Sequence, residues 1–281
     1  MFVRRVTTGY AGPPMILLPP FLPDSRGNRL AEYEVRQDRQ TGQRRIYLCG
    51  PEEVAEQLRT FARCAPMPMT RAQSRQWTHR LSHDGPVSGR VRDALDQFKE
   101  VLVLRVRQPI DTGIALDFYK DPSSHHDPMQ WSDTYAGSLI YRGKYCGNTA
   151  AEQELAERLA RVIERHPTYA AADYVLVVPG HDQTRVSFGE RLATTVAGLV
   201  NKPVVRVRAL NLQRAQAKAR QPGDPALADE FEVGDEVAGR VLIAVDDVWG
   251  HGDTMGAIAG KAKSAGANAF LALVGARRMR S

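Results

Sequence analysis

The chain has 281 residues, enough for one large domain or two ordinary ones at roughly 100–200 residues per domain. Hydrophobic residues make up 43% of the sequence and charged residues 25%, a balance that is typical of globular proteins and excludes collagen-like, coiled-coil and wholly disordered chains. The 38 basic and 32 acidic residues leave a net charge of +6, which fits a phosphate-bearing partner but does not require one.

The first residues combine an arginine pair with apolar stretches, but four prolines interrupt the apolar core that a signal peptide needs: Pro13, Pro14, Pro19 and Pro20. No apolar run approaches the roughly 20 residues of a membrane helix. We therefore expect a cytoplasmic protein without a membrane partner. The three cysteines are widely spaced and form no Cys-x-x-Cys pair, so the sequence predicts neither a disulfide framework nor a zinc site.

The N-terminal part mixes strand and helix patterns. Residues 30–50 alternate on both sides of Thr41-Gly42, which predicts an antiparallel hairpin. Pro51 is expected at the first position of a helix. Apolar spacing predicts helices at 51–64 and 88–98 and strands at 101–107 and 113–119. We interpret residues 1–130 as an α+β domain or extension of unknown family, which ends at the turn-rich stretch 121–128.

The stretch from Arg59 to Arg80 contains five arginines and no acidic residue. In a helix, Arg71, Arg75 and His79 would share one face. Together with Trp77 as a stacking residue, Arg71 and Arg75 would form a surface that follows the phosphates of a nucleic acid. The alternative is a solvated arginine face with Trp77 in the core.

From about residue 131 the pattern becomes regular. Asn148 or Thr149 can cap a helix whose apolar stripe includes Leu155 and Leu159. Further helices are expected at 187–200 and 254–267, and strands at 174–178, 204–210, 239–245 and 269–275. Strands that alternate with helices predict a parallel sheet flanked by helices. We therefore expect an α/β domain over residues 131–281.

The segment 241–255 carries the clearest chemical signal. A buried strand delivers two carboxylates, Asp246 and Asp247, to its C-terminal end, and a loop with Gly250 and Gly252 then leads into a helix near Thr254. Ligands of open α/β sheets bind at this end of the strands. Backbone N–H groups of a glycine-bearing loop at a helix N-terminus cradle anions. Carboxylates accept hydrogen bonds from vicinal hydroxyls, so the segment predicts a site for a ribose 5-phosphate.

At these residues the segment resembles the phosphoribosyl pyrophosphate (PRPP) motif of type I phosphoribosyltransferases, a hydrophobic strand and an acidic pair followed by a loop that usually ends Thr-Gly-x-Thr. Residues 134–160 resemble the Lys-Tyr-x-Gly segment and first helix of the ComF family, and residues 172–197 its strand, pyrophosphate loop and second helix. Residues 206–248 follow the order of the same family. The resemblance covers residues 133–281 and implies a phosphoribosyltransferase-like parallel sheet.

The resemblance also implies roles for individual residues. Asp246 and Asp247 would hold the ribose hydroxyls, and Lys218 and Arg220 would close over the departing pyrophosphate. Mg²⁺ would bind mainly through oxygens of PRPP, with no direct protein ligand. The family often forms homodimers. The 5-phosphate would lie on Gly250, His251, Gly252, Asp253 and Thr254, and the pyrophosphate on Pro179, Gly180 and His181.

Three departures leave two functions open. His251 stands where the family usually has threonine, Asp253 adds a carboxylate to the cradle, and the N-terminal zinc-binding cysteines of the ComF family are missing. The first hypothesis is a PRPP-dependent phosphoribosyltransferase with an unidentified base or other acceptor. The second is an inactive ComF-like module that binds nucleic acid or nucleotides, in DNA uptake or processing.

Overall fold

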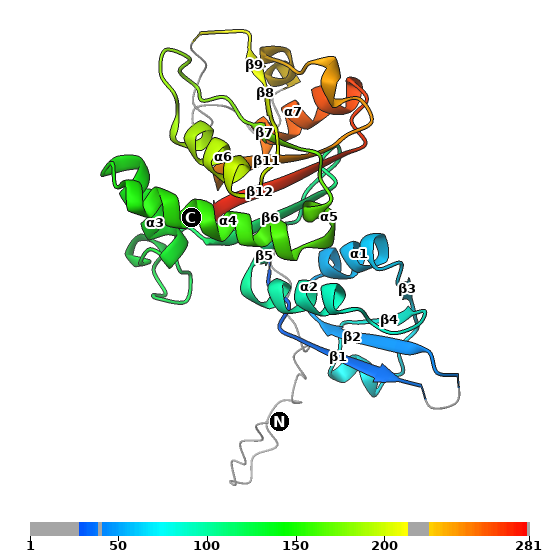
Figure 1. Cartoon of the computed structure of the whole chain (residues 1–281). Coiled ribbons are helices and arrows are strands. Elements are labelled where there is room, and N and C mark those ends of the chain that lie inside the picture. Colours follow the sequence, from blue (N-terminus) through cyan, green and yellow to red (C-terminus); the bar gives the residue numbers. More distant parts are fainter. Residues whose placement is uncertain (1–27, 39–40, 213–224, 280–281) are drawn as a thin grey trace.

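The computed structural model describes residues 28–38, 41–212 and 225–279. It contains an antiparallel sheet with two helices, followed along the chain by a larger, mostly parallel sheet with helices on both faces (Figure 1). Lys218 and Arg220, to which the resemblance assigns the pyrophosphate, lie outside the described residues.

The larger sheet has six strands in the order β5-β6-β12-β11-β7-β8. Neighbouring strands are parallel except β5, which runs antiparallel to β6. The predicted α/β fold class is therefore confirmed. The strands are β5 (Leu102–Val103), β6 (Thr112–Phe118), β7 (Tyr174–Val177), β8 (Val204–Arg206), β11 (Val241–Trp249) and β12 (Ala269–Arg277).

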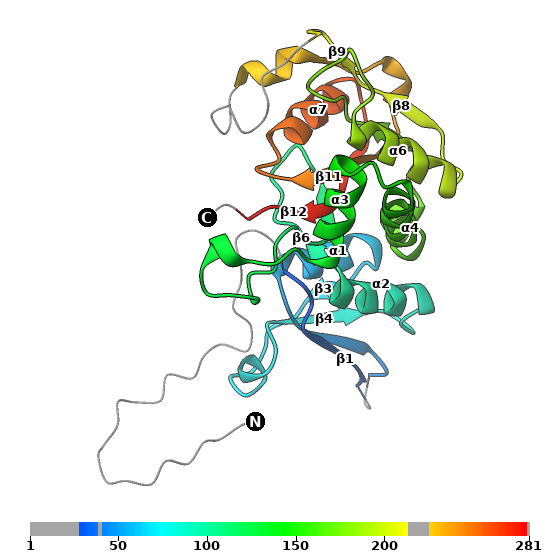
Figure 2. The same cartoon turned by 90° about the vertical axis from the view of Figure 1, so that its left-hand side faces the viewer.

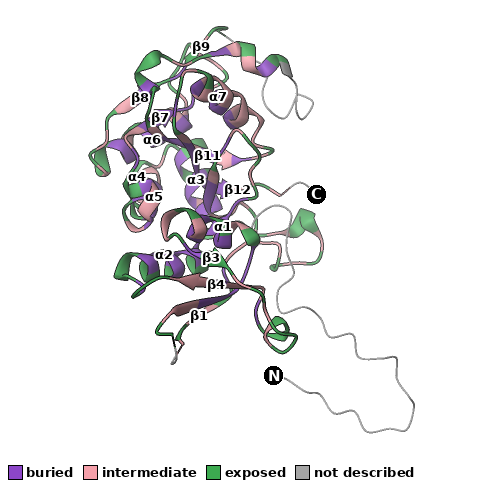
Figure 3. Cartoon of the chain, turned by 90° about the vertical axis from the view of Figure 1, so that its right-hand side faces the viewer, coloured by how far each residue is buried: buried purple, intermediate pink, exposed green. Residues whose placement is uncertain are grey.

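Helices cover both faces of this sheet. On one face α3, α4 and α6 share an apolar core with Ile243 and Val245 of β11, and on the other face α7 shares a core with Leu242 and Ala244. Successive strand residues point to opposite faces, so one continuous apolar run serves both cores. Figure 3 shows β11 and β12 buried between the layers. The helices are α3 (Tyr135–Tyr145), α4 (Thr149–Arg165), α5 (Pro167–Ala170), α6 (Phe188–Leu199) and α7 (Asp253–Ser264).

Side-chain caps mark the starts of α4 and α6. The Asn148 side chain accepts a hydrogen bond from the backbone N–H of Ala151 at 2.9 Å, as the sequence predicts for the start of α4. Ser187 and Glu190 form a reciprocal capping box at the start of α6. These caps satisfy N–H groups that the helix itself leaves without partners.

The predicted strand 204–210 is divided between two sheets. Its first half is β8 at the edge of the large sheet, while β9 (Arg208–Ala209) pairs antiparallel with β10 (Phe231–Glu232). Short 3₁₀ helices follow at Pro225–Glu230 and Asp235–Val237. The segment beyond β8 therefore forms a separate small ribbon.

The N-terminal part forms a four-stranded antiparallel sheet in the order β1-β2-β4-β3. The predicted hairpin and both predicted helices are confirmed, although Pro51 is the N-cap of α1 and not its first residue. Figure 2 shows this sheet and its two helices beneath the large sheet. The elements are β1 (Glu32–Gln37), β2 (Arg44–Cys49), α1 (Glu52–Phe61), β3 (Ala65–Pro66), β4 (His79–His83) and α2 (Gly89–Glu100).

The two parts are joined more closely than a boundary at residue 130 suggests. Strands β5 and β6 precede residue 130, yet they belong to the six-stranded sheet, in which Ile114 of β6 pairs with Leu273 of β12. Helix α2 packs against α4 and α5. One apolar core also runs from Leu81 in the N-terminal sheet to Leu155 of α4. The six-stranded sheet therefore does not start at the predicted boundary.

A buried histidine lies where α1 meets α4 and α5. His166 is fully buried, and its Nε2 lies 2.8 Å from Oε1 of Gln57. Its Nδ1 accepts a hydrogen bond from the backbone N–H of Thr168, so a neutral ring with the proton on Nε2 satisfies both contacts. Burial lowers the pKa of His166 to about 3. The ring edges that surround it belong to Phe61, Phe98 and Tyr169.

The basic segment does not form the helical surface that its spacing suggests. Arg71 precedes a 3₁₀ turn at Gln73–Arg75, and His79 already belongs to β4, so the prediction of a shared helix face is wrong. Trp77 is 2% exposed and packs against Tyr47, with ring centroids 5.8 Å apart. Trp77 is therefore a core residue and cannot stack on a nucleic acid, whereas Arg71 and Arg75 are exposed.

None of the helices in the described ranges is long and apolar enough to cross a membrane.

Candidate functional site

The predicted site residues of the C-terminal half that the structure describes lie on β11 and on the loops at one edge of the six-stranded sheet. Strands β6, β7, β11 and β12 are parallel, so the loops that follow them meet at their common C-terminal edge. The β7–α6 loop contains Pro179, Gly180 and His181, and the predicted cradle 250–254 comprises the β11–α7 loop and the first two residues of α7. Strand β11 continues to Trp249, so the acidic pair lies inside the strand and not at its end.

Asp246 lies against the first turn of α6. A Cβ atom placed on Gly189 would come within 2.6 Å of Asp246 Oδ1, so only glycine leaves room for this carboxyl group. The carboxyl also accepts a hydrogen bond from the backbone N–H of Asp247 at 2.8 Å. Burial, together with the negative charge of Asp247, raises the pKa of Asp246. The acidic pair thus tends to hold a proton in the absence of a ligand.

Asp247 is also buried, with 7% of the residue exposed. Its Oδ2 lies 2.5 Å from Nζ of Lys144, in the last turn of α3. Burial disfavours the charge of Lys144, but the attraction and hydrogen bond of Asp247 outweigh it, so the pKa of Lys144 is raised. The site therefore places a cation directly on the acidic pair.

The cradle is shaped by the packing of Trp249. Gly252 has φ +84°, and a Cβ atom there would come within 2.3 Å of the Trp249 ring. Trp249 is buried and is therefore a packing residue beneath the loop. Arg277 at the end of β12 donates hydrogen bonds to the backbone carbonyls of Trp249 and Gly250. These contacts fix the loop from both sides.

The two residues that depart from the resembled motif occupy different positions. His251 is exposed, while Asp253 is the first residue of α7 and is partly buried together with Thr254. The N-cap residue of α7 is Gly252, which has no side chain that could cap the helix. The N-terminus of a helix carries partial positive charge, so both Asp253 and a phosphate would be stabilised there, and each would repel the other.

The β7–α6 loop is held by its own side chains. Gln183 Nε2 donates to the carbonyl of Gly180 at 2.6 Å, and Thr184 donates to Asp182. A Cβ atom on Gly180 would come within 2.7 Å of the Ser187 Cβ, so the loop turns back tightly onto the start of α6. His181 lies at the exposed tip of this turn.

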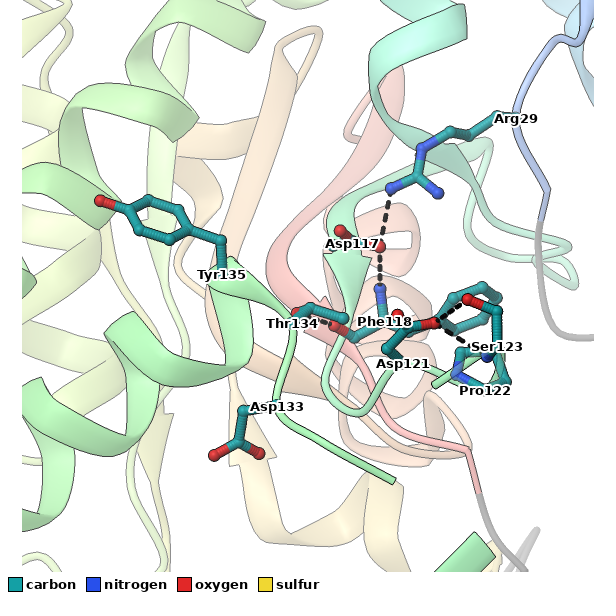
Figure 4. A pocket seen from close by; sticks show the side chains of 9 residues that line it. All are labelled: Arg29, Asp117, Phe118, Asp121, Pro122, Ser123, Asp133, Thr134 and Tyr135. Atoms are coloured by element: carbon teal, nitrogen blue, oxygen red, sulfur yellow. Dashed lines mark hydrogen bonds and ion pairs between the residues drawn. The ribbon is translucent and has the colours of Figure 1, made fainter. Parts of the chain in front are cut away.

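A pocket of about 540 Å³ opens at the end of β6. Figure 4 shows Arg29 reaching Asp117, with an N–O distance of 2.7 Å, and Asp121 bonded to Ser123. The carboxylates that line the pocket have partners within the protein, and Asp133 pairs with Lys120 at 2.7 Å. The other residues that line the pocket are Phe118, Pro122, Thr134 and Tyr135.

Tyr119 directly follows Phe118 of this pocket, and its carbonyl accepts a hydrogen bond from the backbone N–H of Thr134, another pocket residue. Burial raises the pKa of Tyr119, and the charges of Asp133 and Asp247 raise it further, while Lys144 lowers it. The pKa of Tyr119 therefore depends on charged groups of the pocket and on those of the acidic pair.

Among the described residues, no cluster of three or more His, Cys, Asp or Glu side chains is arranged to hold a metal ion.

Two residues of this edge carry contacts that the sequence did not assign to them. Lys144 was part of the Lys-Tyr-x-Gly resemblance, and that motif was the signal that could have marked it as a site residue. Nothing in the sequence around Arg277 predicts that it holds the β11–α7 loop.

No family model and no curated protein matches the sequence. Among solved structures, a purine phosphoribosyltransferase from Pyrococcus horikoshii is 14% identical to this chain, with a TM-score of 0.30. The matched region covers 45% of this chain and 83% of that enzyme. A hypoxanthine phosphoribosyltransferase from Staphylococcus aureus is 10% identical with a TM-score of 0.30, and covers 46% and 75%. An allosteric regulatory enzyme of purine biosynthesis is 11% identical with a TM-score of 0.31, and covers 83% of this chain and 45% of its own. At such identities and TM-scores these likenesses carry no argument about what this chain binds.

Proposed function

We propose that the chain binds a ribose 5-phosphate unit at the C-terminal edge of its six-stranded sheet and acts as a PRPP-dependent phosphoribosyltransferase. In this proposal Asp246 and Asp247 accept hydrogen bonds from the ribose hydroxyls. The loop 250–254 binds the 5-phosphate, and the loop residues 179–181 bind the pyrophosphate. The acceptor is a base or another nucleophile.

One observation carries the proposal: the acidic pair of β11 lies between two glycine-containing loops that each lead into a helix. The β11–α7 loop enters α7 through Gly252 with a left-handed backbone, and the β7–α6 loop folds back onto the start of α6 at Gly180. The start of α7, with glycine as its N-cap, presents backbone N–H groups and a positive dipole end, which suit a phosphate group, whereas Ser187 and Glu190 already cap the start of α6. The carboxylates between the two loops suit hydroxyl groups and would repel a third anion.

The proposed reaction exchanges one bond at the anomeric carbon for another. The bond from the anomeric carbon to the pyrophosphate oxygen breaks, and pyrophosphate leaves with the bonding electrons. A lone pair on the acceptor forms the new bond, and the proton of the acceptor passes to solvent or to pyrophosphate. Positive charge develops on the sugar as the bond breaks, so the negative acidic pair stabilises that charge and the loop amides stabilise the leaving group.

The donor set fits Mg²⁺ only in part. Carboxylate oxygens such as those of Asp246 and Asp247 are the ligands that this hard cation prefers. No third candidate ligand accompanies these two carboxylates, because the described residues contain no cluster of three His, Cys, Asp or Glu side chains that could hold a metal ion. When bound with the ligand, Mg²⁺ would neutralise phosphate charge, and most of its coordination would come from PRPP and water.

The nucleic-acid alternative depends on Arg71, Arg75 and Trp77. Burial of Trp77 removes its stacking residue and leaves exposed arginines alone. An electrostatic contact of that kind would weaken steeply with salt. Measuring the affinity of single-stranded DNA at two salt concentrations tests what remains of this alternative.

Calorimetric titration of PRPP with Mg²⁺ tests the proposal on the wild type and on Asp246→Asn/Asp247→Asn. We expect micromolar binding by the wild type and none by the double variant. Asp229→Asn is a matched control, because this carboxylate is 86% exposed beside α7 and pairs only loosely with Lys261 at 3.5 Å. Thermal unfolding shows whether each variant is folded. Absence of binding by the wild type would contradict the site, and binding without pyrophosphate release across a panel of bases would contradict the transferase.

A further inference from the structure

A lysine already holds one carboxylate of the acidic pair. Nζ of Lys144 lies 2.5 Å from Oδ2 of Asp247, and the Asp247 side chain is only 10% exposed. Mg²⁺ loses water reluctantly and usually keeps several water molecules when it binds to a protein. Asp247 therefore has little surface left for a hydrated metal ion while Lys144 is in place.

The second carboxylate of the pair is also engaged. Oδ1 of Asp246 accepts a hydrogen bond from the backbone N–H of Asp247 at 2.8 Å, and it lies against Gly189 at the start of α6. The positive charge of Lys144 acts on Asp246 as well as on Asp247. A divalent ion on Asp246 would thus lie near an ammonium group, and two cations in a partly buried site repel each other strongly. Neither carboxylate is therefore a favourable metal ligand while the lysine is present.

The position of this ammonium group follows from the way α3 is held. Lys144 belongs to the last turn of the helix, where the partial negative charge of the helix C-terminus favours a cation. At the other end, Thr134 caps α3 by accepting a hydrogen bond from the Gly137 N–H at 3.0 Å. The helix passes the Tyr119 carbonyl so closely that a Cβ atom on Gly137 would come within 2.0 Å of it. These contacts fix α3 in the position from which Lys144 reaches Asp247.

We propose that Lys144 stands in for a metal ion at the acidic pair, so that the pair binds its ligand without a divalent cation on either carboxylate. The ammonium group neutralises one of the two negative charges and still has N–H donors for oxygen atoms of a ligand. The proposal rests on the proposed function for the identity of that ligand, a ribose 5-phosphate unit. It confines Mg²⁺ to the phosphate groups of PRPP.

Mn²⁺ alone is the first probe, because electron paramagnetic resonance counts bound Mn²⁺ without any organic ligand. We expect the wild type to bind no Mn²⁺ at the acidic pair. Lys144→Met should gain a site whose affinity is at least about tenfold higher, because the competing cation is gone. Adding Asp247→Asn to Lys144→Met should abolish this site. Lys144→Arg keeps a cation beside Asp247 and should gain no site.

A second lysine–aspartate pair provides the matched control. Nζ of Lys263 lies 2.8 Å from Oδ2 of Asp111, and the two side chains are 26% and 34% exposed. Asp111 directly precedes β6, so this pair lies at the opposite edge of the six-stranded sheet from the acidic pair. Lys263→Met frees one carboxylate and not two adjacent ones, so it should gain no Mn²⁺ site.

The second probe is ribose 5-phosphate, titrated by calorimetry with Mg²⁺ and with a chelator. The wild type should bind it equally well in both conditions. In Lys144→Met the affinity should depend on Mg²⁺, because the metal ion then supplies the missing positive charge. Thermal unfolding shows whether each variant is folded, and Lys144→Gln replaces Lys144→Met if the methionine variant is not.

Three results would overturn the proposal. The first is a Mn²⁺ site in the wild type that disappears in Asp246→Asn/Asp247→Asn, since the metal ion would then bind beside the lysine. The second is the absence of a new Mn²⁺ site in the folded lysine variant. The third is wild-type binding of ribose 5-phosphate that requires Mg²⁺. Failure of the proposed function looks different, because the wild type would then bind no ribose 5-phosphate in either condition while the Mn²⁺ results would stand.

Discussion

Lys144 and Asp247 are 103 residues apart in the sequence, yet their side chains meet at 2.5 Å and join α3 to β11. The Asp247 side chain is 10% exposed and that of Lys144 is 38% exposed. The contact therefore compensates a nearly buried carboxylate with a cation that still reaches solvent. A ribose hydroxyl that binds Asp247 has to share this carboxylate with Lys144.

The first prediction concerns the loss of this cation. Lys144→Met leaves Asp247 buried without its partner and next to Asp246, so we expect a destabilisation of about 1–3 kcal/mol at pH 8, below the full cost of breaking a buried pair because Lys144 is partly solvated. Chemical denaturation measures it. Lys120→Met removes the more exposed pair with Asp133 and should cost less than about 0.5 kcal/mol. Equal costs in the two variants would contradict this account.

The second prediction is that Asp246→Asn stabilises the folded protein. Burial and the charge of Asp247 raise the pKa of Asp246, so its stability contribution is complete below the unfolded pKa near 4 and is lost as pH rises through the higher folded pKa. Asparagine does not titrate. The advantage of the variant should therefore grow from about pH 4 upward and reach on the order of 1–2 kcal/mol at pH 8. Melting temperatures at pH 5 and pH 8 test this, and an advantage that shrinks with pH would refute it.

The third prediction concerns the shape of the cradle. Gly252→Ala places a Cβ atom at φ +84° and within 2.3 Å of the buried Trp249 ring, so we expect a loss of more than about 2 kcal/mol. Gly250→Ala is the control from the same loop, because a Cβ atom there meets no atom within 4 Å. Denaturant unfolding of both variants measures the difference. A Gly252→Ala variant as stable as Gly250→Ala would show that Trp249 moves aside at little cost.

The sequence predicted the local elements of the C-terminal half well, because local signals determine them. The apolar run 241–245 specified a doubly buried strand, and Asn148 marked the start of α4. The strand pattern at 113–119 was equally clear. It could not say that β6 would join β12 in the large sheet, because a strand pattern carries no information about its partner.

The contacts that shape the site were beyond sequence reasoning for the same reason. The pairing of Lys144 with Asp247 depends on where α3 docks, and the bracing by Arg277 depends on the neighbouring end of β12. The basic segment shows the opposite case. Arginine spacing suggested a helix, but the segment forms a 3₁₀ turn and a strand, and Trp77 between them is buried beside Tyr47.

The fourth prediction is an acid sensitivity that comes from His166. Its folded pKa of about 3 lies below the unfolded value of 6.5, so the unfolded chain binds an extra proton as pH falls below 6.5 and stability is lost down to the folded pKa. One proton corresponds to about 1.4 kcal/mol per pH unit. Relative to wild type, His166→Gln should gain stability by that amount per unit between pH 6 and pH 4. Parallel stability curves for His166→Gln and wild type over this pH range would contradict the prediction.

The last prediction asks whether the departures in the cradle weaken phosphate binding. A threonine at position 251 would add a hydroxyl donor to the loop, and Asp253→Asn would remove a negative charge from the start of α7, where a phosphate would lie. If residues 250–254 bind the 5-phosphate, His251→Thr and Asp253→Asn should each raise the affinity for ribose 5-phosphate about three- to tenfold, which corresponds to one modest hydrogen bond or one screened charge. Asp229→Asn removes a charge near the same helix but away from the loop and should leave the affinity unchanged. Calorimetry at two salt concentrations separates the two effects, because only the gain of Asp253→Asn should shrink at high salt. If both loop variants bind ribose 5-phosphate no better than Asp229→Asn does, the phosphate does not lie on this loop.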